Sequence, residues 1–341
     1  MKYFILFIFI FLSPIIGAQE YLIYPDAPIT DHSDTIFGKV LEDPYRLFEQ
    51  QDERSDSWVS AQDKLLRKFR KKELKNFKTV YNYLYSYNYT NYKPLIKKGK
   101  NYYFFKYKDF YSSPSLYRQA SYFGNPSLII NPQNFSTTGE ILSITNFEVS
   151  SDENHIAFAL SESGKDWRTI RIRDNMRAKF LDDEIKWVKY SNIRWKGEGF
   201  FYWKYDEPEP GKELLERVKN QKLYYHKLNT PQEEDSCVYQ IPEKELARSS
   251  FEVTSDEQFL ILYTFKKVGY RWVKTIIYKD LHSQEDFKVL LEYPKNLSEY
   301  SIIDNIGHKF YILTNFNANN YKVICFNAET NKIEDIVKED S

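Results

Sequence analysis

Short apolar runs recur along most of the chain and predict β-strands. Five runs rich in aromatic and branched residues begin 54, 45, 59 and 50 residues apart, at 101–107, 155–160, 200–205, 259–265 and 309–315. A second strand-like stretch follows each run, at 115–120, 167–174, 222–228, 274–281 and 321–327. Paired short strands at this spacing indicate a structural unit that repeats about every fifty residues.

A longer signature marks the same repeat. The sequences FEVSSDE at 147–153 and FEVTSDE at 251–257 lie 104 residues apart, which is two periods. Their polar ends are suited to capping a turn before the next strand. A single four-stranded blade cannot bury both of its faces, so such units stack against one another. The pattern therefore predicts a mainly β fold, an incomplete β-propeller of about five blades spanning residues 81–341.

Residues 19–80 differ from this pattern and predict an N-terminal arm. Proline-marked, acidic sequence at 21–54 indicates extended chain, and residues 56–73 carry an apolar stripe at helical spacing. The stripe consists of Trp58, Ala61, Leu65 and Phe69. Beyond it, tyrosines alternate strictly, and this period of two predicts a strand at the start of the propeller. These are Tyr81, Tyr83, Tyr85, Tyr87 and Tyr89.

The first eighteen residues have the features of a signal peptide. Lys2 precedes an apolar run from Tyr3 to Ile16, and Gly17 and Ala18 are small residues suited to cleavage. The run contains Pro14 and is short for a membrane span, so a signal peptide is favoured over an anchor. We expect an exported protein, periplasmic or secreted, whose mature chain starts at Gln19.

Charge and cysteine content narrow the choice of partners. Lys+Arg and Asp+Glu both number 48, so no net field attracts nucleic acid or a membrane surface, and neither is expected as a partner. Eight basic residues between 64 and 78 are interpreted as a solvated helix face. Cys237 and Cys325 could form one disulfide in an oxidising compartment, but two separate, small apolar residues are the favoured interpretation.

Motifs for catalysis, metals and cofactors are absent from the sequence. No G-x-S-x-G, G-x-G-x-x-G or Walker loop occurs, and the five histidines are at least 26 residues apart. The acidic clusters at 182–184 and 233–235 lack the spacing of a calcium loop. We therefore expect no metal and no cofactor and single out no catalytic residue, although a triad assembled in space stays open.

An ordered series of short motifs resembles the N-terminal half of prolyl oligopeptidases. In the arm the series comprises Tyr24-Pro25, Asp34, Phe37-Gly38, Asp43-Pro44-Tyr45-Arg46, Trp58-Val59 and Ala61-Gln62. It continues through Tyr92-Lys93-Pro94, Ser163-Gly164, Asp166-Trp167, Val188-Lys189-Tyr190, Lys222-Leu223-Tyr224 and Asn319-Asn320-Tyr321. The family has Trp-Leu-Glu after the arginine, where this chain has Leu47-Phe48-Glu49. The resemblance covers about residues 21–337.

The resemblance implies an architecture and three site residues. In that family of serine peptidases a seven-bladed propeller covers an α/β-hydrolase domain, and the arm packs against the hydrolase. The hydrolase supplies the serine, aspartate and histidine that cleave after proline, so the resemblance implies that this chain, with about five blades of the seven-bladed plan, lacks them. Tyr190 matches a phenylalanine that lines the substrate pocket. Asp166 and Trp167 match a loop that faces the hydrolase. A strand-edge aromatic and a turn carboxylate are the structural alternatives for Tyr190 and Asp166.

Two functions remain open at this point. The chain can be the propeller portion of a serine-type endopeptidase, inactive alone, whose partners are short proline-containing peptides and a hydrolase domain supplied in cis or in trans. Alternatively it is a stand-alone secreted propeller that binds peptides or proteins without cutting them. Whether the chain is an enzyme is therefore undecided by its sequence, and the coding sequence downstream would separate the two.

Overall fold

The computed structural model describes residues 22–49, 52–72, 74–87, 95–108, 112–215, 218–241, 249–268, 270–292 and 299–340. The chain divides into two compact units, residues 1–88 and residues 89–341, which are considered separately. The predicted signal peptide and the last tyrosine of the alternating series lie outside the described residues.

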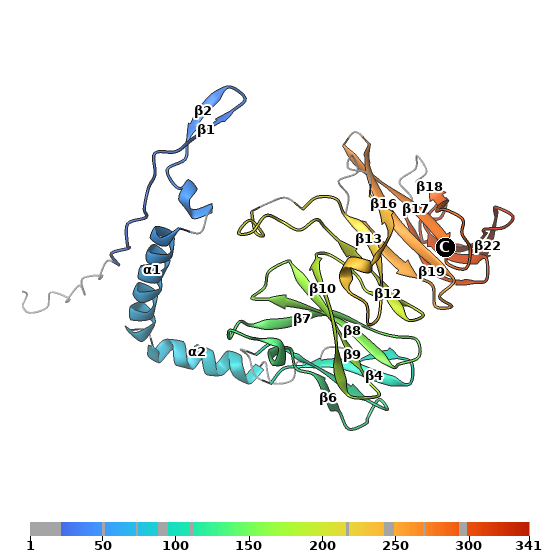
Figure 1. Ribbon diagram of the computed structural model, residues 1–341, viewed down its shortest axis with the longest axis horizontal. Helices are drawn as coiled ribbons and strands as arrows, with labels where there is room; N and C mark the ends of the chain where they lie inside the picture. Colours follow the sequence, from blue (N-terminus) through green and yellow to red (C-terminus); the bar gives the residue numbers. More distant parts are fainter. Residues whose placement is uncertain are drawn as a thin grey trace, which may run out of the picture. The chain divides into compact units, whose positions relative to one another are not determined.

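The first unit contains the predicted arm. Its elements are β1 (Ser33–Ile36), β2 (Lys39–Glu42), the 3-10 turn η1 (Arg46–Glu49), α1 (Glu53–Lys72) and α2 (Leu74–Tyr87) (Figure 1). Arg46 forms ion pairs with Asp34 on the hairpin, with Asp43 at 3.0 Å and with Glu49 at 2.6 Å. Residues of the arm's motif series thus fasten the β1–β2 hairpin to the turn that follows it.

Helix α1 confirms the predicted helix over residues 56–72 and starts three residues earlier, whereas residue 73 lies outside the described residues. The Asp52 carboxylate accepts the backbone N–H of Arg54 at 2.8 Å, which satisfies one of the free amides at the helix N-terminus. On its apolar stripe, Trp58 donates from Nε1 to the Pro25 carbonyl at 3.1 Å and packs edge-on against Phe48. Part of the stripe is therefore covered by the extended chain of the arm itself.

The strand predicted at the alternating tyrosines is wrong, because Tyr81, Tyr83, Tyr85 and Tyr87 belong to helix α2. Phe77, Val80, Tyr81 and Leu84 also have the i, i+3, i+4, i+7 spacing of a helix face. The rings of Phe77 and Tyr81 stack with centroids 6.1 Å apart, a contact that an extended strand cannot make at a spacing of four residues. The boundary between the two units accordingly lies at residue 88 rather than at 80.

The described strands of the second unit make five successive antiparallel blades of four strands each (Figure 1). Three of the blades are separate sheets, whereas blades 2 and 3 are joined into one eight-stranded sheet by the pairing of Val188 with Lys204. Blade 1 consists of β3 (Ile96–Lys98), β4 (Asn101–Lys106), β5 (Ser115–Gln119) and β6 (Ser127–Ile130). Blade 2 consists of β7 (Leu142–Val149), β8 (His155–Glu162), β9 (Arg168–Asp174) and β10 (Lys179–Val188). Blade 3 is β11 (Arg194–Lys196), β12 (Gly199–Lys204), β13 (Lys222–Lys227), β14 (Ser236–Gln240). Blade 4 consists of β15 (Ser250–Val253), β16 (Phe259–Val268), β17 (Arg271–Asp280) and β18 (Lys288–Glu292). Blade 5 consists of β19 (Tyr300–Ile306), β20 (Lys309–Thr314), β21 (Lys322–Asn327) and β22 (Lys332–Val337). The ten predicted runs are the second and third strands of these blades, which confirms the mainly β, partial-propeller fold.

Alternation along the second strands explains how the blades stack. In β16, Phe259 and Ile261 belong to the apolar cluster shared with blade 5, whereas Leu260 and Leu262 belong to the cluster shared with blade 3. Blades 1 and 2 share a third cluster, and blades 2 and 3 share a fourth. Because successive side chains point to opposite faces of a strand, one apolar run supplies two interfaces.

The repeated Ser-Asp-Glu sequence links neighbouring blades as well as capping turns. Asp152 caps its own turn by accepting the Asn154 N–H at 3.0 Å. Glu153 reaches blade 1, where it accepts the Lys100 N–H at 2.9 Å. In the second copy, Glu257 accepts the Gly197 N–H of blade 3 at 2.8 Å and the Ser151 hydroxyl of blade 2 at 2.6 Å. Both glutamates therefore satisfy backbone donors of a preceding blade.

A buried histidine joins blades 2 and 3 near the same end. His226 is fully buried, with Nδ1 2.7 Å from Asp235 Oδ1 and Nε2 3.0 Å from Asp183 Oδ1. Burial lowers the pKa of His226, but the two carboxylates outweigh it and raise the pKa to about 9. Burial likewise opposes ionisation of Asp183, yet the hydrogen bond from His226 keeps its pKa below the usual range. The histidine is therefore an imidazolium held between two carboxylates.

The remaining expectations concern cysteines and membrane spans. Cys237 is exposed and Cys325 is buried, and both are free thiols, so the favoured interpretation of two separate residues is confirmed. Among the described residues, no helix is both long and apolar enough to cross a membrane.

Candidate functional site

The predicted site residues meet at one end of blade 2. Asp166 lies in the turn between β8 and β9, and Tyr190 lies in the connection from β10 to β11. The Tyr190 hydroxyl donates to Asp166 Oδ2 at 2.7 Å, although 24 residues separate them in sequence. Trp167 is the next residue after Asp166. The structure thus brings Tyr190 together with the Asp166-Trp167 loop, from which it is distant in sequence.

Lys189 completes this cluster as a central cation. Its Nζ lies 3.4 Å from Asp166 Oδ2, 5.2 Å from the centre of the Trp167 ring and 5.4 Å from the centre of the Tyr190 ring. Cation–π contacts of this kind orient both rings around the ammonium group. The Tyr190 hydrogen bond, followed by the charge of Lys189, lowers the pKa of Asp166, so the site holds a stable carboxylate at neutral pH.

Trp167 is fixed by its polar edge and by two other rings. Its Nε1 donates to the Glu213 carbonyl at 2.6 Å. The Trp187 ring stands perpendicular to it at 5.5 Å, and the Tyr205 ring meets it edge-on at 6.3 Å. Burial, together with the nearby Tyr190 hydroxyl, raises the pKa of Tyr205 to about 12. Four aromatic residues from three segments therefore form one wall of the site.

The connection that carries Tyr190 has unusual backbone geometry. Trp187 and Tyr190 adopt φ values of 58° and 51°, in the left-handed region that bulky residues avoid. Ser191 anchors the connection, because its hydroxyl accepts the Trp203 N–H at 2.7 Å and its carbonyl accepts from Asn146 at 3.1 Å. Strained backbone held in place this way is characteristic of sites that present side chains to a partner.

The cluster leaves one aromatic ring exposed beside polar groups. Tyr190 is 57% exposed, and its hydroxyl donates to Asp166. The exposed ring, the Asp166 carboxylate and the Trp167–Trp187 pair offer apolar area and hydrogen-bonding groups together. Among the described residues, no group of three or more His, Cys, Asp or Glu is placed to hold a metal ion.

The chain matches a known family over nearly all of its length. The model for the prolyl oligopeptidase N-terminal β-propeller domain matches residues 25–341. The chain belongs to the prolyl oligopeptidase family. It is 29% identical over 329 residues to a prolyl endopeptidase of Elizabethkingia miricola, covering 93% of this chain and 45% of that protein. It is also 29% identical over 355 residues to prolyl oligopeptidase A of Galerina marginata, covering 93% of this chain and 47% of that protein.

Solved structures of prolyl oligopeptidases agree with the fold. Prolyl oligopeptidase B of Galerina marginata, solved with a 35-residue substrate for hydrolysis and macrocyclisation, superposes with a TM-score of 0.71 at 26% identity. That match covers 93% of this chain and 48% of the solved one. The chain thus spans about half the length of the prolyl oligopeptidases that it matches.

Sequence reasoning did not single out Lys189, Trp187 or Tyr205. In the sequence, Lys189 stands out only as the residue before Tyr190. Its position between the Trp167 and Tyr190 rings depends on how the β8–β9 turn and the β10–β11 connection fold together. One signal was available for Trp187. A bulky residue just before Val188-Lys189-Tyr190 interrupts the strand alternation, which is typical of a bulge, and β9 and β10 do pair with a register shift at this point.

Proposed function

We propose that this chain is the propeller portion of a prolyl oligopeptidase-like serine endopeptidase that cleaves short peptides after proline, with the propeller limiting access to the active site. The observation that carries the proposal is the convergence of Tyr190, Asp166 and Trp167 into one cluster, which has an exposed ring. Their convergence favours a shared role over three unrelated structural roles.

Each residue has a part in this proposal. Tyr190 lines the substrate pocket from the propeller side, and Asp166 and Trp167 contact the catalytic domain. Tyrosine stands where the family pattern has phenylalanine, so its hydroxyl adds a hydrogen bond that phenylalanine cannot make. That bond holds the exposed ring in one orientation and lowers the entropy lost when a peptide packs against it.

Complementation with a separate catalytic domain tests this function. The chain is mixed with the catalytic half of the Elizabethkingia miricola prolyl endopeptidase, and hydrolysis of a chromogenic peptide with proline before the cleaved bond is measured. We expect no hydrolysis by the chain alone, together with an increase in the activity or size selectivity of the catalytic half when the chain is added.

Substitutions in the cluster then separate the two candidate functions. Trp167→Ala and Asp166→Ala should each lower the effect of the added chain at least tenfold, whereas Tyr122→Ala, at an exposed tyrosine of blade 1, should not. If the catalytic half is unaffected by the intact chain, the endopeptidase role is rejected and the stand-alone binding propeller is favoured. Hydrolysis by the chain alone that a serine-directed inhibitor blocks would also reject the proposal.

We further propose that the protein is exported and cleaved after Ala18. The charged start, apolar run and small residues at 1–18 support this. Intact-mass measurement on the extracytoplasmic fraction should give a chain that begins at Gln19. A membrane-bound species that retains Met1 would contradict export with cleavage.

A further inference from the structure

A hollow lies beside the aromatic pair on blade 2, next to the cluster already described. Its volume is about 510 Å³, and Trp167, Trp187, Leu142 and Leu160 contribute to its apolar lining. Trp187 also lines a second hollow of about 310 Å³. Grooves lined by aromatic rings can bind extended, proline-containing peptides, because the pyrrolidine ring packs on aromatic side chains.

Most charged groups around the larger hollow are already engaged. Glu162 pairs with Lys165 at 2.9 Å, and Glu184 pairs with Arg171 and with Lys186. The other two carboxylates of the lining accept hydrogen bonds from neighbouring groups: Glu140 from Thr137 and Thr138, and Glu213 from the Gly211 N–H. Every carboxylate of the lining therefore has a donor within the protein.

Arg168 is the exception among the cations of the lining. Within the part of the chain that the structure describes, it forms no ion pair, and Asp166, the acid whose pKa it influences, is taken by Tyr190 and Lys189. The Nε atoms of Arg168 and Arg171 are buried and have no hydrogen-bond acceptor among the described groups. The Arg168 side chain as a whole is only partly buried, so an acidic group that enters the hollow can reach its guanidinium.

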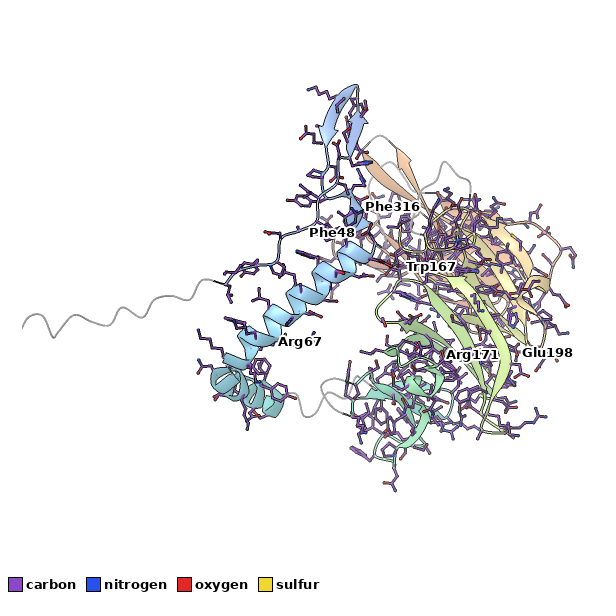
Figure 2. All side chains as sticks on the ribbon, turned by 60° about the vertical axis from the view of Figure 1, so that its left-hand side comes forward. Phe48, Arg67, Trp167, Arg171, Glu198 and Phe316 are labelled. Carbon is purple, nitrogen blue, oxygen red and sulfur yellow. The ribbon has the colours of Figure 1, made fainter. Side chains whose placement is uncertain are left out.

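We propose that this hollow binds a short peptide that ends in a proline carboxylate. The carboxylate pairs with the Arg168 guanidinium, for which its two oxygens are the matching acceptors. The proline ring packs against the Trp167–Trp187 pair, whose rings are in edge-on contact with centroids 5.5 Å apart. Figure 2 labels Trp167, just before β9, and Arg171 on β9. The choice of proline rests on the proposed function, since cleavage after proline releases such a peptide, whereas the carboxylate site rests on the hollow alone.

Direct binding to the full chain tests the site without any catalysis. The probes are acetyl-Ala-Pro-Pro with a free carboxylate, the same peptide as an amide, and acetyl-Ala-Ala-Ala with a free carboxylate, each titrated by calorimetry. We expect the carboxylate form of the proline peptide to bind at least tenfold more tightly than its amide, and at least fivefold more tightly than the alanine peptide.

Variants locate the binding. Arg168→Gln should reduce affinity for the carboxylate peptide at least tenfold, to the level of the amide, and Trp187→Leu should weaken both proline peptides. Arg177→Gln removes an exposed arginine at the other end of the same blade and should change nothing. Thermal unfolding of each variant shows that the chain is folded.

Four results would overturn the proposal. These are absence of binding at millimolar peptide, equal affinity for acid and amide, equal affinity for proline and alanine peptides, or unchanged binding by Arg168→Gln. None of them depends on hydrolysis, so a failed complementation and a failed binding site are distinguishable.

Discussion

At one end of blade 2, Asp152 caps the turn at 150–155, and Glu153 accepts a hydrogen bond from the backbone of blade 1. Near the same end, His226 of blade 3 pairs with Asp183 of blade 2. At the other end, Trp167, Trp187 and Tyr190 gather around Lys189, one ring is largely exposed, and two arginine Nε atoms lack acceptors. The strands between are the same, so the difference lies in the connections. One end is built for stability between blades, and the other retains the features of a binding surface.

The largest effect should follow from loss of the buried imidazolium. His226→Gln leaves Asp183 and Asp235 buried without a counter-charge, which typically costs about 3–5 kcal/mol. Urea denaturation should show a loss of this size. His282→Gln, at an exposed histidine, serves as the control and should lie within about 0.5 kcal/mol of the wild type. Equal stability of both variants would mean that the clamp is not stabilising.

The same histidine predicts a pH dependence. Because its pKa is raised to about 9 in the folded chain, its contribution is complete below the unfolded pKa near 6.5 and is lost as pH rises through about 9. The stability gap between wild type and His226→Gln, on the order of 3 kcal/mol, should therefore close between pH 6.5 and 10. Below about pH 4, the ordinary pKa of a carboxyl group, the gap should also narrow, since the lowered pKa of Asp183 in the folded chain means that the unfolded chain binds this proton first. A gap that is constant from pH 6 to 10 would contradict this origin.

Two glycines sharpen the contrast between the ends. A Cβ at Gly199, on the stabilising end, would lie 2.1 Å from the His226 carbonyl and 2.6 Å from the Tyr225 ring. Gly199→Ala should therefore cost about 3 kcal/mol or more. At the other end Gly164, with φ of +78°, has nothing within 4 Å of such a Cβ, so Gly164→Ala should cost only the backbone strain of about 1–2 kcal/mol. Thermal denaturation of both variants measures the difference, and a reversed order would break the comparison.

The smallest expected losses of stability come from changing one hydrogen bond at each of the two ends of the blades. Glu257→Gln weakens the link from blade 4 to the Gly197 N–H and should lower stability by about 1 kcal/mol. Tyr190→Phe removes a hydrogen bond to an exposed carboxylate and should lower stability by less than about 0.5 kcal/mol. Urea denaturation of the two variants together tests this, and a larger loss from Tyr190→Phe would assign that end a stabilising role.

The sequence was most informative where burial imposes a period. The central strands of every blade are covered on both faces, so their apolar runs are long and recur at regular intervals. The segment at 74–87 misled because tyrosines at every second position fit a strand, while Phe77, Val80, Tyr81 and Leu84 fit a helix equally well. The local pattern of apolar residues fits both a strand and a helix here, so it could not decide between them.

The site was predictable residue by residue but not as a cluster. Resemblance indicated Tyr190, Asp166 and Trp167, yet their contact depends on left-handed backbone at Trp187 and Tyr190 and on the register shift in blade 2. Lys189 is central for the same reason, since only the folded connections place an ammonium group between two rings. Long-range geometry of this kind leaves no periodic trace in a sequence.

Amide hydrogen exchange with and without the catalytic half of the Elizabethkingia miricola relative tests the division between the two ends most directly. The division predicts slower exchange at 163–168 and 187–191 when the catalytic half is added, with no change at 150–154 and 195–199. Protection confined to the second pair of segments, or no protection anywhere, would contradict it.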